Sequence, residues 1–491
     1  MRVKRFVALL SLLVLVWGCN HAAEPVATEA KVPVWKAANA SPFLVEPYLQ
    51  WGDSPDANHG HSLEVVWQTD DFGAEWDVQY GFDRQKPWLK ADPLAMRRIV
   101  VPSIPPHRLY RAHLPNLQPG GRFSYRVRND GVVAFGSDAT APKAVDSHFR
   151  FVVLGDCGAN TQGQKALAFQ TYRLHPDFVM ITGDIVYDRG RISEYREKFW
   201  PIYNANGVSP DQGAPIMRST VFFAAPGNHD IVSRDLGKYP DGLAYFLYWL
   251  QPLSGPAGQQ GDAALPRLLG PEANQQAFRD AAGEAYPRMA NFSFDYGNSH
   301  WTVLDGNPYV DWRDPKLRDW VKTDLSAASK AAWRFVVFHQ PAFNSSRAHF
   351  DEQNTRRLAD LFEEGKVDVA FSGHVHNYQR TFPLHFVAEK VAGDKEARKK
   401  GHVPGRWTLD RSFDGQKVTH PNGVIYLTTG AGGAKLYNPE QQDDPSSWQE
   451  FTHKFVSKVH SLTVAEVEGP KLTIRQISLD GKELDKFVVT K

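Results

Sequence analysis

Cysteine is almost absent from this 491-residue chain, which contains only Cys19 and Cys157. Cys19 lies at the end of an N-terminal targeting segment, where we expect it to be modified or removed. Cys157 is then left without a partner in the chain, so no disulfide is expected to stabilise the fold. Cys157 stands next to a candidate metal ligand, Asp156, but a small buried side chain is the interpretation that we prefer for it.

A strong net charge is missing as well. The 56 basic and 55 acidic side chains give a formal net charge of +1, so no long-range attraction to nucleic acid or to an anionic membrane is expected. The sequence shows no internal repeat. Hydrophobic residues make up 42% of the chain, which is enough to build a core and excludes disorder for most of it. The length allows two to three domains.

A long hydrophobic run occurs only at the N-terminus, where basic residues precede the apolar segment 6–17. This segment is too short for a permanent membrane anchor and is typical of a signal peptide. The following Gly18-Cys19 resembles a bacterial lipobox, in which the cysteine is lipidated, and the alternative is ordinary signal cleavage near Ala22-Ala23. Both alternatives predict an exported protein, either periplasmic or a lipoprotein of the outer membrane or cell surface.

The remaining chain divides by its patterns into a linker at 20–40 and two domains, at 41–147 and 148–491. The first domain has short alternating segments such as LEVVWQT (63–69) between turn residues, which predicts an all-β sandwich. Its stretch 112–127 resembles a fibronectin type III strand pair. In the second domain, strand-like segments alternate with helical stretches at 164–174, 316–325 and 355–364, which predicts an α/β fold.

Five of the strand-like segments of the second domain end in side chains that bind metals. Because α/β sheets place their sites at the carboxyl ends of strands, we expect these side chains to meet. An oxygen- and imidazole-rich set of this size suits two adjacent, fairly hard metal ions. The candidate ligands are Asp156, Asp184, Tyr187, Asn228, His339, His374 and His376.

Asp184 and Tyr187 lie in one short turn, Gly183-Asp184-Ile185-Val186-Tyr187. A carboxylate can bridge two cations through its two oxygens. A phenolate ligand requires a strongly charged ion to hold it deprotonated, which favours Fe(III) over Mg(II) or Zn(II) at Tyr187.

Histidines complete the site in two different ways. In Gly227-Asn228-His229-Asp230 the amide of Asn228 offers an oxygen ligand, and His229 lies beside the metal without binding it. The alternative is a core histidine hydrogen-bonded to Asp230. His374 and His376 follow a strand, and in a loop they can reach two different ions.

These five motifs, in this order, resemble the purple acid phosphatases of the calcineurin-like metallophosphoesterase superfamily. The resemblance covers nearly the whole mature chain, since Pro47-Tyr48-Leu49-Gln50-Trp51 is similar to the start of the fibronectin-like domain of plant-type members. Segments 291–297 and 378–380 look similar too. The resemblance implies a fibronectin type III-like β-sandwich followed by a four-layer αββα metallophosphoesterase domain.

The resemblance also implies roles for single residues. Asp156, Asp184, Tyr187 and His376 would hold Fe(III), and Asp184 would bridge to a divalent ion (Fe, Zn or Mn) held by Asn228, His339 and His374. His229 would face the substrate, with Asp230 orienting it. Plant-type members have two adjacent histidines where this chain has Ala348 and His349, so His349 is the remaining candidate contact to the leaving group. The alternative for His349 is a surface histidine in a mobile loop.

The function expected from these features is hydrolysis of phosphate monoesters by a hydroxide formed on two metal ions. The alternative is a phosphodiesterase or nucleotide hydrolase on the same site, for which the insertion 231–289 can build a groove. An inert hydrolase fold serving adhesion is the third possibility, but no ligand is lost. The glycine-rich 430–435 segment lacks the ending of a P-loop and predicts a tight turn. The expected partner is a small phosphate ester, not nucleic acid, with membrane contact only through a lipid on Cys19.

Overall fold

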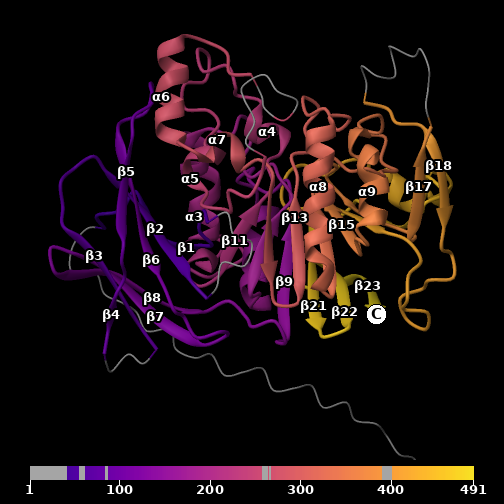
Figure 1. Ribbon diagram of the computed structural model, residues 1–491, viewed down its shortest axis with the longest axis horizontal. Helices are drawn as coiled ribbons and strands as arrows, with labels where there is room; N and C mark the ends of the chain where they lie inside the picture. Colours follow the sequence, from indigo (N-terminus) through magenta and orange to yellow (C-terminus); the bar gives the residue numbers. More distant parts are fainter. Residues whose placement is uncertain (1–40, 55–60, 83–86, 257–263, 265–266, 390–400) are drawn as a thin grey trace, which may run out of the picture. The chain divides into compact units, whose positions relative to one another are not determined.

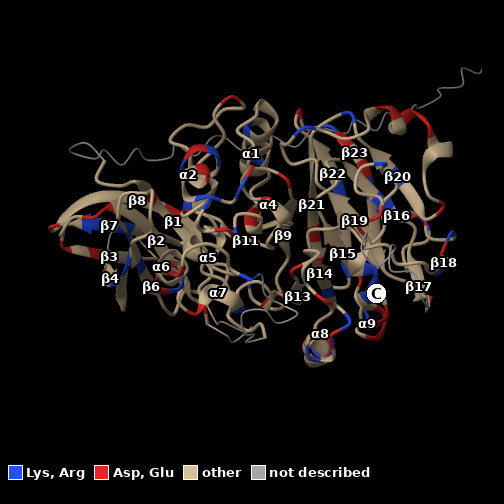
Figure 2. Ribbon diagram, turned by 90° about the horizontal axis from the view of Figure 1, so that it is seen from above, with Lys and Arg blue, Asp and Glu red and all other residues tan. Residues whose placement is uncertain are grey.

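The computed structural model describes residues 41–54, 61–82, 87–256, 264, 267–389 and 401–491. The predicted signal segment, the linker and the lipidation site at Cys19 lie outside these residues. The chain from Ala37 to Lys491 clusters into one compact unit. Within the described ranges, no helix combines the length and the apolar character that a bilayer crossing requires. Acidic and basic residues are interspersed along the same helices and loops (Figure 2), as the balanced charge predicts.

The N-terminal part is a sandwich of two antiparallel sheets, which confirms the prediction. Trp67 and Tyr110 stack between the sheets with centroids 5.2 Å apart. One sheet has the order β1 (Val45–Gln50), β2 (Leu63–Asp70), β6 (His107–Leu114) and β5 (Leu94–Ile99), and the other β4 (Leu89–Lys90), β3 (Trp76–Gly81), β7 (Arg122–Asn129) and β8 (Val132–Thr140). The fibronectin-like stretch 112–127 therefore joins β6 to β7 across the sandwich, and these two strands are not hydrogen-bonded to each other.

Two larger sheets form the second part of the chain. The five strand segments expected to end in metal ligands are all present, and parallel pairing of neighbouring strands in each sheet aligns their carboxyl ends. The six-stranded sheet has the order β11 (Val221–Ala224), β10 (Phe178–Ile181), β9 (Phe149–Leu154), β21 (Ser461–Glu468), β22 (Lys471–Ser478) and β23 (Glu483–Thr490). The seven-stranded sheet has the order β12 (Phe292–Tyr296), β13 (Ser299–Val303), β14 (Trp333–Val337), β15 (Val369–Ser372), β19 (Ile425–Thr429), β16 (Tyr378–Thr381) and β20 (Thr452–Val456).

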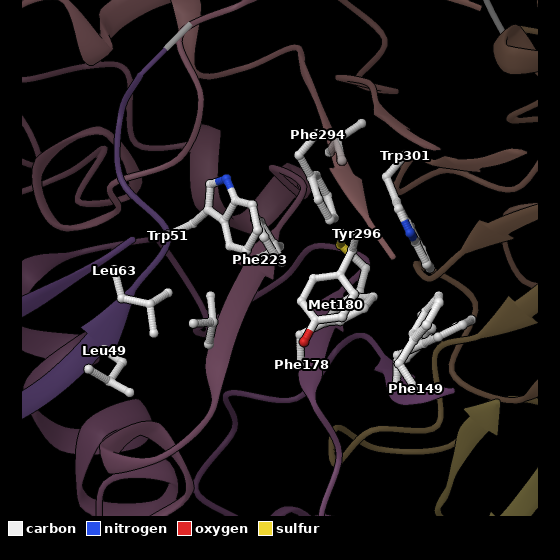
Figure 3. Close-up of a cluster of buried hydrophobic side chains, with 14 of the residues drawn as sticks. Leu49, Trp51, Leu63, Phe149, Phe178, Met180, Phe223, Phe294, Tyr296 and Trp301 are labelled. Carbon is white, nitrogen blue, oxygen red and sulfur yellow. The ribbon is translucent and has the colours of Figure 1, made fainter. Parts of the chain in front are cut away.

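These two sheets pack face to face and are covered on their outer faces by helices. Successive strand residues point to opposite faces, so Phe178 of β10 enters the core between the sheets and Val179 faces the helices. Phe223 and Phe294 stack across the sheets with centroids 3.8 Å apart (Figure 3). Helix α1 (Gln162–Leu174) covers the six-stranded sheet (Figure 2), and α8 (Pro315–Ala327) packs on β13 of the other (Figure 1). The predicted four-layer αββα arrangement is confirmed.

Shorter elements connect the layers. The predicted helix at 355–364 begins as a 3-10 turn, η4 (Asn354–Leu358), and continues as α9 (Ala359–Glu364). The strands β17 (Leu384–Ala388) and β18 (Gly405–Leu409) form a hairpin. The others are α2 (Ile192–Glu194), η1 (Tyr195–Phe199), α3 (Trp200–Tyr203), η2 (Ile216–Arg218), α4 (Asn228–Ile231), α5 (Tyr245–Tyr248), α6 (Glu272–Ala282), α7 (Ala285–Arg288), η3 (Ala328–Lys330), η5 (Pro439–Asp443) and η6 (Pro445–Ser447).

The aromatic cluster 245–249 of the long insertion packs in the core and does not line a rim. Tyr245 is fully buried, and its hydroxyl lies 3.0 Å from the carbonyl oxygens of both Ala224 and Met289, to either of which it can donate. The sandwich docks on the same cluster, because the Gln50 side chain bonds both to the Tyr248 carbonyl (2.9 Å) and to the Leu250 N–H (2.8 Å). The insertion thus joins the two parts of the chain.

Candidate metal centre

The strand ends bring the predicted ligands to one place between the two sheets. Donor atoms of Asp184, His339 and His374 lie within 4.8 Å of one another, and so do those of Asp156, Asp184 and His376. Asp184 belongs to both groups, and all five side chains are buried. Asn228 joins the first group through Oδ1, 3.1 Å from Nε2 of His339. This arrangement is consistent with a binuclear metal site that shares one carboxylate.

The backbone is held in an unusual conformation at three of these positions. Asp156, Asp184 and His374 have φ angles of 57°, 51° and 66°, in the left-handed region that non-glycine residues seldom adopt. The surrounding loops leave no room to relax, since a Cβ atom on Gly227 would lie 2.1 Å from the backbone nitrogen of Asp184. Glycine is therefore required beside the site, and it lets the loop of Asn228 approach the loop of Asp184.

Two of the histidines already have the hydrogen bonds that orient a metal ligand. Nδ1 of His339 donates to the Thr182 carbonyl over 2.8 Å, and Nδ1 of His376 donates to the Lys435 carbonyl over 2.6 Å. With Nδ1 engaged in this way, Nε2 of each ring faces the site and can bind an ion once it has lost its proton, the arrangement found in metal-ligating histidines. The donor set and its orientation fit two bound ions.

Tyr187 is buried beside the carboxylates. Its hydroxyl donates to Oδ1 of Asp156 over 3.1 Å and lies 3.0 Å from Nε2 of His376. Burial, followed by the negative charges of Asp156 and Asp184, raises the pKa of Tyr187 well above its usual value. Burial also opposes ionisation of Asp184, but His339 outweighs it and holds the pKa of that carboxyl below its usual range.

His229 points into the site, and Asp230 does not orient it as we expected. Nδ1 of His229 donates to the Asp188 carbonyl over 2.8 Å, which leaves Nε2 facing the site, 3.9 Å from Oδ2 of Asp184. The Asp230 carboxylate accepts from the backbone N–H groups of Gly227 (2.8 Å) and Ile185 (3.2 Å). The turn places Asp230 under the loops and away from the imidazole, so it fixes the backbone that carries Asn228 and Asp184.

His349 reaches the site from an anchored loop. Its ring centroid lies 4.0 Å from that of His374, and Nδ1 is 2.7 Å from Oε1 of Glu352. The preceding residue, Ala348, donates its N–H to Oδ1 of Asn438 over 3.0 Å and accepts from Asn344 over 2.9 Å. The structure therefore places His349 beside the predicted ligands.

Sequence reasoning missed two residues of the site. Glu352 links His349 to His374, since its Oε2 lies 2.9 Å from Nε2 of His374. Its position three residues after His349 is a signal that the two side chains share a turn. Tyr437 stacks on the ring of His376 with centroids 4.0 Å apart. Tyr437 lies on the loop after β19, a strand that carries none of the predicted ligands, and no motif marks it.

Comparisons with known proteins agree with this geometry. The family of calcineurin-like phosphoesterases matches residues 149–378. Purple acid phosphatase 23 of Arabidopsis thaliana is 23% identical over 364 residues, which cover 69% of this chain and 65% of that protein. Probable inactive purple acid phosphatase 1 of the same plant is 24% identical, covering 79% of this chain and 58% of its own length. The matched region thus spans less than two thirds of either relative.

A solved structure shows the same fold. The purple acid phosphatase PPD1 from yellow lupin (Lupinus luteus) seeds superposes with a TM-score of 0.61 at 18% identity, over 90% of this chain and 74% of that one. This likeness covers the fold, with its β-sandwich followed by the paired sheets. Residues 149–378 thus match the calcineurin-like phosphoesterases, and the chain as a whole is similar to the purple acid phosphatases, with the plant proteins as distant relatives.

Proposed function

We propose that this chain hydrolyses phosphate monoesters with a centre of Fe(III) and one divalent ion, Fe, Zn or Mn. The observation that carries the proposal is the sharing of Asp184 by two buried groups of ligands. One group, with Asp156, Tyr187 and His376, contains the phenol that suits Fe(III). The other, with Asn228, His339 and His374, contains the neutral donors that suit a divalent ion.

The ions, when bound, would activate water and offset the negative charge of the phosphate. The chain's own residues would do the rest. His229 keeps Nε2 free by donating through Nδ1, so this atom can carry a proton to a phosphoryl or leaving oxygen. Glu352 accepts from Nδ1 of His349 and leaves the second nitrogen of that ring free for the leaving group.

An inert fold is the competing proposal, because two of the relatives are described as probably inactive. The intact donor set argues against inertness in this chain. Asp156 and Asp184 are 0% and 1% exposed, and two carboxylates buried so close together are costly unless cations compensate them. A protein that had lost its metals would be more stable if these buried carboxylates were replaced. All seven candidate metal ligands are nevertheless present in this chain.

Metal analysis combined with a substrate panel tests the proposal. We expect two metal ions per chain, and turnover of p-nitrophenyl phosphate at least ~10-fold above that of bis(p-nitrophenyl) phosphate, since the proposal assigns the site to monoesters. The reverse ratio would establish the phosphodiesterase alternative instead. Two bound ions with no turnover of either ester would establish an inert fold.

We also propose that the protein is exported and anchored by a lipid on Cys19, on the strength of the lipobox-like Gly18-Cys19 after an apolar run. Metabolic labelling with palmitate tests this proposal. Label in the full chain and none in Cys19→Ala supports the anchor, whereas an unlabelled exported protein would show ordinary signal cleavage.

A further inference from the structure

Three cationic side chains lie around one aromatic ring, that of Tyr239. Arg189 Cζ, Arg191 Cζ and Lys238 Nζ lie 5.5, 5.9 and 5.4 Å from the ring centroid of Tyr239. Each contact is favourable by itself as a cation–π interaction. The cations repel one another, however, and a negative charge bound nearby would offset this repulsion.

Carboxylates of this region are largely engaged elsewhere. Asp241 is fully buried and pairs with Arg191 over 2.7 Å. Glu194 accepts from the backbone N–H groups of residues 188, 189 and 191, and Asp235 from those of residues 237 and 238. Among the residues that the structure describes, no carboxylate forms an ion pair with Arg189 or Lys238. This holds for the exposed Asp188 as well. Both cations are exposed and available to a ligand.

The cationic group is tied to the metal centre by a short, fixed loop. Asp188 binds Nδ1 of His229 through its carbonyl, and Arg189 is the next residue. Gly190 follows with φ 61°, and a Cβ atom there would lie 2.7 Å from Cα of Asp230, so the loop packs directly on the turn that carries His229. The carbonyl of Gly190 is held by the Ala244 N–H over 2.9 Å. Arg189 is therefore the next residue in the chain after Asp188, whose carbonyl orients His229.

We propose that Arg189, Lys238 and Tyr239 form a subsite for a second anionic group of the substrate. This inference rests on the proposed function and names a substrate class for it: phosphate esters whose leaving group carries another phosphate. An arginine and a lysine without carboxylate partners suit a phosphate dianion, and the guanidinium can bind two of its oxygens at once. The Tyr239 ring supplies a surface on which the carbon skeleton of the leaving group packs.

Two sugar phosphates that differ by one phosphate test the subsite. We expect the wild type to prefer fructose 1,6-bisphosphate over fructose 6-phosphate by ~10-fold or more in kcat/KM, since a second phosphate adds charge-assisted hydrogen bonds. Arg189→Ala/Lys238→Ala should remove this preference through KM for the bisphosphate, and Arg189→Lys/Lys238→Arg should restore most of it. Lys417→Ala, at an exposed lysine of the turn before β19, is the matched control and should keep the preference.

Equal losses for both sugars, or a preference that survives the double alanine variant, would overturn the subsite. Failure of the proposed function looks different, because the wild type would then hydrolyse neither sugar phosphate nor p-nitrophenyl phosphate. In that event calorimetry with methylenediphosphonate and methylphosphonate decides the matter without turnover. Tighter binding of the diphosphonate that is lost in Arg189→Ala/Lys238→Ala supports the subsite, and equal binding of both probes by wild type and variant excludes it.

Discussion

The backbone N–H of His229 donates to Oδ1 of Asp184 over 2.9 Å, while Nε2 of the same histidine lies 3.9 Å from the other carboxylate oxygen. The turn that presents His229 to a substrate thus also fixes the carboxylate that we expect to bridge the metals. The imidazole itself is oriented by Asp188, through a backbone carbonyl. Removing the ring should therefore leave the metal ligands in place.

His229→Ala should retain both metal ions and lose turnover by about 10² to 10³ for all esters, because one donor to the phosphoryl oxygens is removed. The measurement is kcat for a series of monoesters together with the metal content of each preparation. A parallel loss of metal would assign His229 to the metal shell and not to the substrate.

His349→Ala should affect substrates unequally. If His349 protonates the leaving group, its loss lowers turnover of alkyl phosphates, whose leaving groups are poor, far more than that of p-nitrophenyl phosphate. The ratio of the two kcat values, variant to wild type, is the measurement. Small and equal losses on both esters would show that the loop places the ring near His374 without using it in the reaction.

Asp184→Asn should be the most damaging change among the ligands. Asp184 belongs to both donor groups, and a neutral amide has one anionic oxygen fewer with which to bridge. We expect the metal content to fall to one ion or none and turnover to drop by about 10³ or more, the scale of lost charge stabilisation by a catalytic metal. Two bound ions with near-normal turnover would contradict the bridging role.

The sequence predicted strands, layers and the meeting of ligands because these follow from local rules. A run such as FVMITGD is apolar at every strand position, and buried parallel strands require such runs. The carboxyl ends of the adjacent parallel strands β9 and β10 then bring Asp156 and Asp184 together, and those of β14 and β15 in the other sheet do the same for His339 and His374, without any knowledge of the loops.

The contacts that could not be predicted from the sequence depend on the conformations of the loops. The ring of His229 is oriented by the carbonyl of Asp188, and any residue can supply a carbonyl. Asp230 lies beside His229 in sequence, yet its carboxylate turns towards Ile185, 45 positions away. Tyr437 reaches His376 from a loop whose course is set by hydrogen bonds of Asn438 to the loop of His349.

Tyr187→Phe tests the identity of the first ion. With Fe(III) bound, the wild type should show a broad visible absorption band from charge transfer between the phenolate and the metal, and the variant should lose it. The fold should persist, because the phenyl ring keeps its buried packing against His229. Circular dichroism checks the fold. A colourless wild type that is fully active with zinc or manganese alone would contradict the Fe(III) assignment.

The last prediction concerns stability. His300, on β13, is buried with Nδ1 2.7 Å from Asp295 and Nε2 3.1 Å from Asp324. Burial lowers the pKa of His300, but the hydrogen bonds and charges of the two carboxylates outweigh it and raise the pKa from 6.5 to about 9. Since the folded state binds this proton more tightly than the unfolded state, the stabilisation is fully present below pH 6.5 and is lost as the pH rises through 9.

Because the folded state binds this proton more tightly, His300 contributes up to about 3 kcal/mol to the free energy of unfolding. We therefore expect the difference in unfolding free energy between wild type and His300→Gln to shrink by about 2 to 3 kcal/mol between pH 6.5 and pH 9.5. Urea denaturation of both proteins at each pH measures it. His420→Gln, at an exposed histidine, is the matched control against which the change at His300 is compared. A constant difference for His300→Gln as well would mean that this histidine is neutral in the folded protein, and that Asp295 and Asp324 bind it only as hydrogen-bond acceptors.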